Sequence, residues 1–501
     1  MRIPIDRDSP APLYQQVESF LRKAILSQSL VPGTRLPSTR HLARDLGVNR
    51  ITIENAYACL EVDGLIAARE GSGTYVLAPA ALPALPVVEP GQPWPLWQQD
   101  RREWLEKGRE PSPDELLRAA GHPRPISFAT GSGDARLFPV EEYRRVIQTV
   151  LRRDGMEALG YGDHFGYGPL RATIAHILGS QGIPARPDSI LVTGGSQQAI
   201  ALVAQLILRP GDTILVESPT YALALDLFRA LRLRIVGVPL DENGMQVEKL
   251  EKALQQHHPR LIYAIPNFHN PTGVCMSLYR RRQLLALADR YNLPILEDDY
   301  VGDLRYEGKA LPALKSLDPG GRVIYASTFS KMLMPGLRVG FLAADGPVYA
   351  DLANFKHFID LTTSNLHQRA LEAYVTVGRY QAHLRRSSQL YRRRRDAMLE
   401  SIHCYLPAGA GTQSPQGGLF LWVRLPEDLR ADELLPLAVE EGVAFSLGDR
   451  FFAEGTSGEQ YIRLNFASQP PELIQEGIQR LGKVMRKVLK PGKGRGSLSE
   501  S

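Results

Sequence analysis

Apolar residues near the start of the chain recur at three- and four-residue steps, which is the period of an amphipathic helix. Pro12 opens this helix, and its apolar face consists of Leu13, Val17, Phe20, Leu21 and Ile25. A second helix is expected between an N-cap at Ser38 and a stop at Gly47, and a third from an N-cap at Asn49 to about Gly64. The pattern therefore predicts three short helices at the N-terminus.

The second and third helices follow each other directly, which predicts a helix-turn-helix. The leading turn of the third helix carries Asn49, Arg50 and Thr52, and this part of the motif meets base edges in a major groove. Two apolar runs, 65–69 and 74–77, flank a glycine-rich turn and predict a two-stranded wing. Helix-turn-helix shapes also occur in plain helical bundles, but the order of three helices and a wing favours DNA binding.

Between Ala78 and about Arg124 the composition shifts to alanine, proline, tryptophan and charge, which is typical of a semi-stiff tether. A short helix at 95–107 is expected within it. A basic, Gly/Ser-rich end of the chain is expected to be flexible. In residue numbers, the predicted parts are a DNA-binding head at 1–78, a linker at 79–125, a large domain at 126–487 and a tail at 488–501.

Short apolar runs alternate with helical segments throughout the large domain, which predicts an α/β fold with a mainly parallel sheet. The runs are 190–193, 213–216, 261–265, 294–297 and 323–326. Several of them end in polar residues. In such sheets, sites gather at the carboxyl ends of the strands, and we therefore examine those ends for chemistry.

Composition adds limits to this picture. A chain of 501 residues is too long for one ordinary core, and its 44% hydrophobic and 23% charged residues are typical of a globular protein. The net charge of +5 permits nucleic-acid contact without requiring it. Three widely spaced cysteines argue against disulfides or a zinc site, and no apolar run is long enough to span a bilayer. We expect a cytoplasmic protein with no metal and no membrane partner.

Lys331 is the first candidate for chemistry. It follows the predicted strand 323–326, and the hydroxyls of Thr328 and Ser330 and the guanidinium of Arg338 are close in sequence. A partly desolvated amine is a nucleophile that attacks an aldehyde cofactor, and hydroxyls with one arginine suit a phosphate. The alternative is a solvated loop lysine.

Two further strand ends and one polar turn carry candidate groups. The strand at 190–193 turns through two glycines into a helix, so the amides of Gly195, Ser196 and Gln197 form a phosphate site by geometry, or simply a tight turn. Asp298 and its neighbour Asp299 would repel when buried, so one needs a cationic partner such as a pyridinium; a helix cap or a divalent metal are alternatives. The turn 266–273 presents Asn270 as a neutral donor, or is an ordinary β-turn.

The head resembles the winged-helix domain of the GntR family of bacterial repressors and activators. The matching stretches are PLYQQ from Pro12, GTRLPSTRHLA from Gly33, NRIT from Asn49, GLI from Gly64 and GSGTYV from Gly71. The resemblance implies that Arg35, Ser38 and Arg40 approach the DNA backbone, that Arg50 and Thr52 face the major groove, and that Gly73 approaches the minor groove. One head contacts few bases, so useful operator affinity requires two heads.

The region from about Ile126 to Lys487 is similar to the fold-type I pyridoxal-phosphate aminotransferases. The similarity implies a small C-terminal subdomain, Lys331 as the Schiff-base lysine and Asp298 as the partner of the pyridinium. It also implies that Asn270 and Tyr300 bind the ring hydroxyl and that Tyr221 stacks on the ring. The implied phosphate ligands are Gly195, Ser196, Gln197, Thr328, Ser330 and Arg338.

Two other residues matter for partners in this resemblance. Arg463 matches the binder of a substrate carboxylate. Tyr161 matches a tyrosine that reaches the phosphate of the partner subunit, which implies an obligate homodimer.

A GntR-type head followed by an aminotransferase-like body is the architecture of the MocR subfamily. It implies a transcription regulator that binds operator DNA and senses pyridoxal 5′-phosphate or a small amino compound. The alternative is a working amino acid aminotransferase with an appended head. Thr328 replaces a serine found in many relatives, and the Asn-Pro-Thr-Gly sequence at 270–273 is the form seen in true aminotransferases. These features leave half-transamination and catalytic turnover as alternatives to pure sensing.

Overall fold

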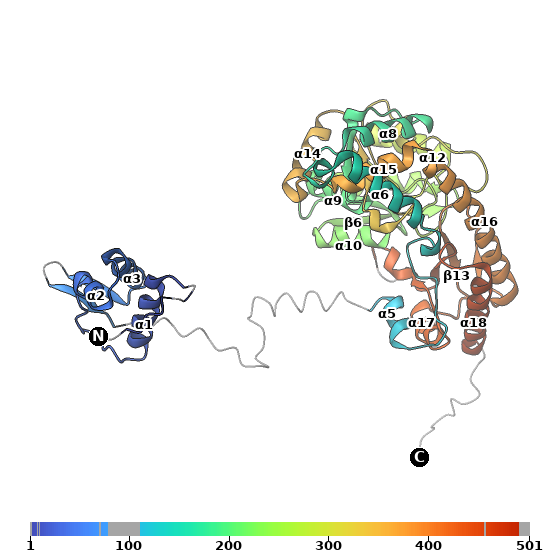
Figure 1. Cartoon of the computed structure of the whole chain (residues 1–501). Coiled ribbons are helices and arrows are strands. Elements are labelled where there is room, and N and C mark those ends of the chain that lie inside the picture. Colours follow the sequence, from blue (N-terminus) through green and yellow to red (C-terminus); the bar gives the residue numbers. More distant parts are fainter. Residues whose placement is uncertain are drawn as a thin grey trace, which may run out of the picture. The chain divides into compact units, whose positions relative to one another are not determined.

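The computed structural model describes residues 3–7, 9, 11–69, 72–78, 111–454 and 457–489. The chain divides into two compact units, Met1–Arg109 and Glu110–Ser501, and each is described by itself (Figure 1). The short helix expected at 95–107 lies outside the described residues, as does the expected tail beyond residue 489.

The first unit contains the three helices and the wing that the sequence predicts. They are α1 (Leu13–Leu26), α2 (Thr39–Leu46), α3 (Arg50–Val62), β1 (Ile66–Arg69) and β2 (Gly73–Val76). The Ser38 side chain accepts a hydrogen bond from the backbone N–H of His41, and Gly47 ends α2 in the left-handed conformation. The apolar faces of the helices meet in one core that includes Val17 and Leu42. This part of the predicted fold is confirmed.

An eight-stranded sheet forms the centre of the second unit. Its order is β4-β11-β10-β9-β8-β5-β6-β7, and neighbouring strands from β10 to β6 run parallel. The bounds are β4 (Ile190–Thr193), β5 (Thr213–Ser218), β6 (Arg234–Asp241), β7 (Gly244–Met245), β8 (Leu261–Ala264), β9 (Ile295–Asp299), β10 (Val323–Thr328) and β11 (Gly340–Ala343). The five apolar runs of the sequence become β4, β5, β8, β9 and β10, which confirms the mainly parallel sheet.

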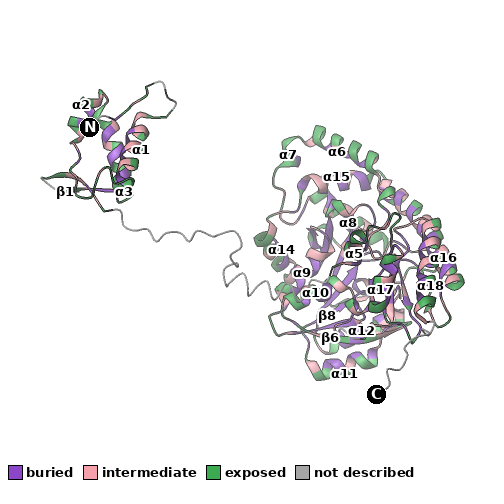
Figure 2. Cartoon of the chain, turned by 90° about the horizontal axis from the view of Figure 1, so that it is seen from below, coloured by how far each residue is buried: buried purple, intermediate pink, exposed green. Residues whose placement is uncertain are grey.

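Helices cover both faces of this sheet, and this explains why its central strands are apolar without alternation. Figure 2 shows α11 on one side of β6 and α10 on the other, and separate apolar clusters fill the two faces. The helices of the second unit are α5 (Pro113–Ala119), α6 (Val140–Asp154), α7 (Met156–Leu159), α8 (Gly168–Ser180), α9 (Ser196–Ile207), α10 (Ala222–Ala230), α11 (Val247–His257), α12 (Leu278–Arg290), α13 (Leu314–Leu317), α14 (Pro347–Asp360), α15 (Asn365–Thr376), α16 (Arg379–Tyr405), α17 (Ala431–Glu440) and α18 (Pro471–Leu489).

A smaller subdomain follows along the chain. Its four-stranded sheet has the order β12-β13-β16-β15, a parallel pair joins β3 to β14, and α16 packs along α18. The strand bounds are β3 (Ile126–Ser127), β12 (Gly411–Thr412), β13 (Phe420–Arg424), β14 (Val443–Ala444), β15 (Ser446–Leu447) and β16 (Tyr461–Asn465). The expected C-terminal α/β subdomain is therefore present.

The end of the expected linker is folded. Ser112 and Glu115 cap α5 reciprocally, and the side chains of Pro113 and Leu117 are buried. The helix contacts α17 and β14 of the small subdomain. Pro113 starts the helix because the first helical position needs no backbone N–H. The segment 111–125 thus belongs to the second unit, and the chain divides near residue 110 rather than near residue 126.

Candidate cofactor site and DNA-binding surface

A cavity of about 340 Å³ opens between the large sheet and the small subdomain. Seven of the predicted cofactor and substrate residues line it, which brings together positions up to about 270 residues apart in sequence. These are Ser196, Tyr221, Asn270, Asp298, Tyr300 and Lys331, and Arg463 joins them from β16. The carboxyl ends of β4, β8, β9 and β10 supply most of this wall, as the strand-end argument predicts.

Lys331 lies in the turn after β10 with its side chain partly buried. Its Nζ donates a hydrogen bond of 2.8 Å to the carbonyl of Gly131. Desolvation, followed by the positive charges of Arg463 and Arg338, lowers the pKa of Lys331 to about 8, and Asp298 opposes the shift. The amine is therefore more often neutral, and more nucleophilic, than a surface lysine.

Asp298 closes the floor of the cavity at the end of β9, with 2% of its surface exposed. Tyr263 on β8 donates its hydroxyl hydrogen to Asp298 Oδ2 at 2.7 Å. In the described part of the chain, Oδ1 has no hydrogen-bond partner. Burial raises the pKa of Asp298 to about 7, since the hydrogen bond from Tyr263 only partly compensates for lost water. A buried carboxylate with a free acceptor oxygen suits a cationic N–H donor.

The expected phosphate ligands lie around the start of α9. Gly195 has φ +113°, a conformation that favours glycine, and a Cβ there would come within 2.9 Å of Arg338 Nη2. Ser330 Oγ is buried with no partner among the described residues. Thr328 is different, because its hydroxyl donates to the carbonyl of Val339 at 3.2 Å. The Thr328 hydroxyl accepts from the backbone N–H of Ser330 and so shapes this turn.

The Gln197 side chain turns away toward α10. The side-chain amide of Gln197 donates to the carbonyl of Leu223 at 3.2 Å. Only the backbone N–H of Gln197 is therefore left for its predicted role as a phosphate ligand. Tyr221 stands at the N-terminus of α10 on the cavity wall, and burial raises the pKa of its hydroxyl to about 12. A phenol that stays protonated suits a stacking and hydrogen-bonding role.

Arg463 is held rigidly at the inner end of the cavity. Its Nη1 donates to Asn270 Oδ1 at 3.1 Å and its Nη2 to Ser446 Oγ at 3.1 Å. The guanidinium carbon lies 4.1 Å from the centroid of the Phe420 ring, and burial lowers the pKa of Arg463 to about 10. Tyr300 donates its hydroxyl hydrogen to the carbonyl of Phe268 at 2.9 Å. The Tyr300 oxygen is therefore available only to accept a hydrogen bond from the hydroxyl of the cofactor ring.

Sequence reasoning missed several of these contacts. Gly131, Tyr263, Ser446 and Phe420 each touch a predicted site residue, yet none stands in a recognisable motif. Ser112, Pro113 and Asp114 also line the cavity, from the helix α5 that the sequence assigned to the linker. A capping-box pattern at Ser112 was the one signal that could have located that helix.

Tyr161 does not enter this cavity. It is 85% exposed and lies on a separate surface with the loop 162–165 and the end of α14. An exposed tyrosine at this place cannot contact the cofactor site of its own chain, so its predicted role depends on a second subunit.

The predicted DNA-contacting residues lie on the surface of the first unit. Arg35 and Arg40 are exposed, and Arg50 Nε donates to Glu54 Oε1 at 2.6 Å while half of its side chain stays exposed. Thr52 is partly buried in the first turn of the same helix. These positions are compatible with the predicted backbone and base contacts.

Three other predicted DNA residues have structural duties in this unit. The side chains of Ser38 and Asn49 accept hydrogen bonds from the first turns of α2 and α3, so both act as N-caps. Gly73 has φ +114°, and a Cβ there would come within 2.9 Å of Arg35 Nε. The glycine therefore gives the Arg35 side chain its place against the wing.

Comparison with known proteins agrees with both halves of this description. Residues 128–481 match the model of aminotransferase class I and II, and residues 13–76 match that of the bacterial regulatory proteins of the gntR family. The probable rhizopine catabolism regulatory protein MocR of Rhizobium meliloti is 32% identical over 489 residues, which covers 95% of this chain and 94% of that protein. The chain belongs to the MocR subfamily of GntR-type regulators.

The second unit of this MocR-type chain also resembles free-standing enzymes. The aromatic-amino-acid aminotransferase 1 of Thermococcus litoralis is 38% identical over 382 residues, covering 75% of this chain and 91% of that protein. The crystal structure of kynurenine aminotransferase from Pyrococcus horikoshii, with PMP bound, is 35% identical and has a TM-score of 0.74. It aligns over 79% of this chain and 100% of that one.

The cofactor of this family is pyridoxal 5′-phosphate, and the MocR-type cavity fits it. Asp298 Oδ1 and Ser330 Oγ are buried polar atoms without partners in the described ranges, and their chemistry suits a pyridinium N–H and a phosphate. Lys331 supplies an amine that loses its proton more readily than a surface lysine. The residues thus match the charge, polarity and reactivity of the cofactor.

The described residues contain neither a membrane-spanning helix nor a cluster of metal ligands. Every helix that the structure describes is too short or too polar to span a bilayer. Within those same ranges, no group of three or more histidine, cysteine, aspartate or glutamate side chains is placed to hold a metal ion.

Proposed function

We propose that this protein is a pyridoxal-phosphate-dependent transcription regulator, which binds operator DNA through its head and senses the cofactor or a small amino compound in the cavity. The observation that carries the proposal is the combination, in one chain, of an exposed recognition helix bearing Arg50 with a complete Lys331–Asp298 site. The full-length similarity to a regulatory protein supports this assignment over an enzyme with an incidental head.

Within the cavity, each group has a distinct task. When bound, pyridoxal 5′-phosphate supplies an aldehyde for amines and an electron-withdrawing ring. Asp298 would hold a proton at the ring nitrogen, Lys331 would provide an amine with a lowered pKa, and Arg463 would orient a carboxylate of the amino compound. Tyr221 and Phe420, which line the cavity, would help to exclude water from this group.

The route from the cavity to the head begins at α5. Ser112, Pro113 and Asp114 at the start of this helix line the cavity, and in the sequence α5 is the first described helix of the second unit. A ligand that moves the first turn of α5 therefore moves the point at which the linker segment joins the second unit. Such a ligand shifts DNA affinity only if it binds two arrangements of α5 with different affinity.

The protein acts as a homodimer in this proposal. Apolar side chains on α7 and at the end of α14 are strongly exposed, and Leu361 lines a surface hollow together with Tyr161. The exposed residues are Met156, Leu159, Tyr161, Phe358, Ile359 and Leu361. A second subunit would cover these side chains, let Tyr161 reach its neighbour's cofactor and bring two heads to one operator.

A second candidate function is catalytic aminotransfer. It is favoured by the intact set of Lys331, Arg463 and the Asn-Pro-Thr-Gly turn at 270–273, and by the similarity of the second unit to free-standing aminotransferases. Sustained transfer of an amino group from an amino acid to a keto acid at ordinary enzyme rates would establish it.

The proposed function is tested by operator binding of the full-length protein with and without cofactor. We expect affinity to change with cofactor, and we expect Arg50→Ala to weaken specific binding about 10- to 100-fold while leaving the visible absorbance of the bound cofactor unchanged. The matched control is Arg152→Ala, since Arg152 is exposed on α6 of the second unit. Operator affinity that ignores both the cofactor and Arg50→Ala would contradict the proposal.

A further inference from the structure

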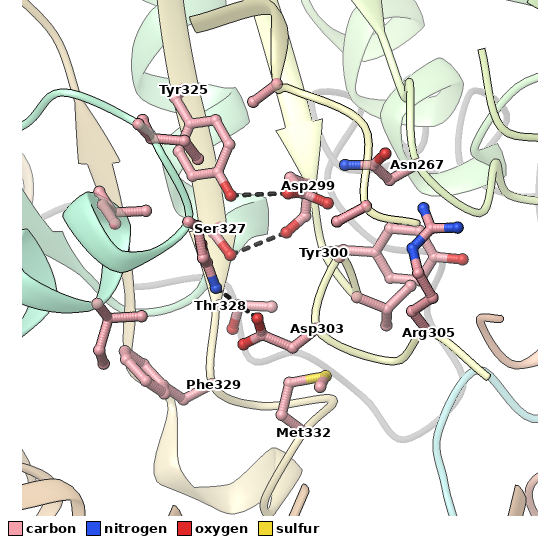
Figure 3. A pocket seen from close by; sticks show the side chains of 18 of the residues that line it. Asn267, Asp299, Tyr300, Asp303, Arg305, Tyr325, Ser327, Thr328, Phe329 and Met332 are labelled. Atoms are coloured by element: carbon pink, nitrogen blue, oxygen red, sulfur yellow. Dashed lines mark hydrogen bonds between the residues drawn. The ribbon is translucent and has the colours of Figure 1, made fainter. Parts of the chain in front are cut away.

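A second cavity, also of about 340 Å³, lies on the other face of the large sheet. Successive side chains of a strand point to opposite faces, so Asp298 turns into the cofactor cavity and Asp299 turns away from it. Tyr325 and Ser327 of β10 pair with β9 on that same far face. Figure 3 shows Asp299 beside both residues at this second cavity, where Tyr325 donates to its side chain and Ser327 to its backbone carbonyl. Asp298 and Asp299, which are adjacent in the sequence, therefore line two different cavities.

The carboxylate of Asp299 lines this second cavity. Its side chain is 6% exposed, and its Oδ2 accepts a hydrogen bond of 2.7 Å from the Tyr325 hydroxyl. Oδ1 has no hydrogen-bond partner among the described residues. Burial raises the pKa of Asp299, and hydrogen bonds and the charge of Arg281 oppose this shift only in part.

Asp303, from the loop after β9, lines the same cavity (Figure 3). Tyr380 donates to its Oδ2 at 2.8 Å, and Gln181 donates to its other oxygen at 2.5 Å. Burial, and to a smaller degree the charge of Asp299, raises the pKa of Asp303 to about 6. The carboxylates of Asp299 and Asp303, each hydrogen-bonded to neutral donors, therefore line the same cavity.

The positive groups nearby are committed elsewhere. Arg305 lies on the cavity wall, but its guanidinium stacks 4.8 Å from the centroid of the Phe268 ring and donates to Gln416. Arg281 is buried behind the wall and donates to carbonyl groups and to Asn267. In the described ranges, neither Asp299 nor Asp303 has a lysine or arginine nitrogen within ion-pair distance.

The remaining wall is aromatic and aliphatic. Phe329 lies 6.0 Å from Phe341 and 5.5 Å from Tyr380, measured between ring centroids, and Met332 extends the apolar surface. Aromatic faces attract cations, and an apolar wall accommodates carbon substituents. We infer that this cavity binds an organic ammonium ion, whose N–H is accepted by Asp299 Oδ1 and whose charge is balanced by Asp303.

This site is separate from the cofactor chemistry but not isolated from it. Tyr300 lines both cavities, and Asp299 follows Asp298 directly on β9. An ammonium ion on the far face therefore acts on the strand that holds the cofactor's ring partner. The inference stands without the regulatory function proposed above, because it rests on the walls of the second cavity alone.

The test uses a probe that cannot react with an aldehyde. N,N-dimethylbutylamine is protonated at neutral pH and carries one N–H, but a tertiary amine cannot condense with the cofactor. Its binding to full-length, cofactor-loaded protein is measured by calorimetry, and the neutral amide N,N-dimethylbutanamide serves as the isosteric control. We expect saturable one-to-one binding of the amine and no measurable binding of the amide.

Two variants locate the binding. Asp299→Asn and Asp303→Asn keep the side-chain shape, and each is expected to weaken binding of the amine at least tenfold. Asp351→Asn, at an exposed position of α14, should bind like the wild type. Absence of binding to the wild type, equal binding of the amide, or unchanged binding in both cavity variants would overturn the inference. Retained cofactor absorbance shows that each variant is folded.

Discussion

Lys331 derives its reactivity from its surroundings rather than from its own chemistry. Burial and the guanidinium groups of Arg463 and Arg338 disfavour its ammonium form, and Asp298 opposes them. The outcome is a pKa of about 8, which lies well below the ordinary value of 10.5 for a lysine. A single amine is thereby prepared for an aldehyde at physiological pH.

Cofactor capture should follow this titration. Because the folded pKa is depressed, the neutral amine predominates above pH 8 and the ammonium below it. The rate at which stripped protein acquires the visible absorbance of bound cofactor is expected to rise about tenfold per pH unit below that value and then level off. Arg463→Gln removes one positive charge and should move the midpoint upward. A rate that keeps rising to pH 10 in the wild type would contradict the assigned pKa.

Gly195 gives a second prediction at this scale. Its backbone has φ +113°, and a methyl group there would approach Arg338 Nη2 to 2.9 Å. Gly195→Ala should weaken cofactor binding at least tenfold in an absorbance titration, because the phosphate turn and Arg338 must both shift. Gly179→Ala is the control, since a Cβ there meets nothing within 4 Å. Equal affinity in the two variants would remove Gly195 from the phosphate site.

The sequence predicts reactive residues better than it predicts their partners. Lys331, Asp298 and Asn270 stand at strand ends or turns, where a polar residue interrupts an apolar run and so attracts notice. Tyr263 lies inside such a run, and its hydroxyl gains meaning only because the parallel register of β8 and β9 brings it to Asp298. Gly131 contacts Lys331 through its backbone carbonyl. Every residue has this group, so no sequence pattern could identify Gly131.

At the scale of elements, the sequence analysis predicted the strands and missed α5. The apolar runs that became β4, β5, β8, β9 and β10 are short, and each ends near a polar residue, which predicts buried parallel strands. The segment containing α5 is rich in proline, and composition alone favours a linker. Its helix is set by the Ser112–Glu115 capping box and by burial of Leu117 against the small subdomain, and only the second of these depends on distant parts of the chain.

This helix provides a prediction of its own. Leu117→Ala removes a buried side chain that anchors α5 and should destabilise this anchor by roughly 2–5 kcal/mol. We expect the variant to keep the visible absorbance of bound cofactor but to lose most of the cofactor-dependent change in operator affinity. Arg118→Ala, at an exposed position of the same helix, is the control. An undiminished response in Leu117→Ala would show that α5 does not link the cavity to the head.

At the scale of the whole molecule, the chain combines a DNA-binding unit with a cofactor-binding unit, and each folds around its own core. The second unit leaves several large apolar side chains exposed on α7 and near the end of α14, among them Met156 at 89% and Phe358 at 81%. Exposed apolar groups gathered in one region favour association, and two-fold association would supply two heads.

Phe358→Asp is expected to weaken this dimer. It places a charge among apolar side chains that the second subunit would bury, so the mass measured by sedimentation should fall toward that of one 55.6 kDa chain at micromolar concentration. Tyr279→Asp is the control, because Tyr279 is 69% exposed on α12, which packs on the other face of the sheet. Identical masses for the two variants would place the interface elsewhere.

The most direct test of the whole account measures operator affinity of the full-length wild type and of Lys331→Ala, each stripped and then supplied with pyridoxal 5′-phosphate at a concentration that saturates the wild type. The account predicts that cofactor changes the affinity of the wild type and leaves that of Lys331→Ala unchanged, with no visible absorbance of covalently held cofactor in the variant. An equal response in both proteins, or no response in the wild type, would contradict the claim that a cofactor held by Lys331 controls the DNA-binding head.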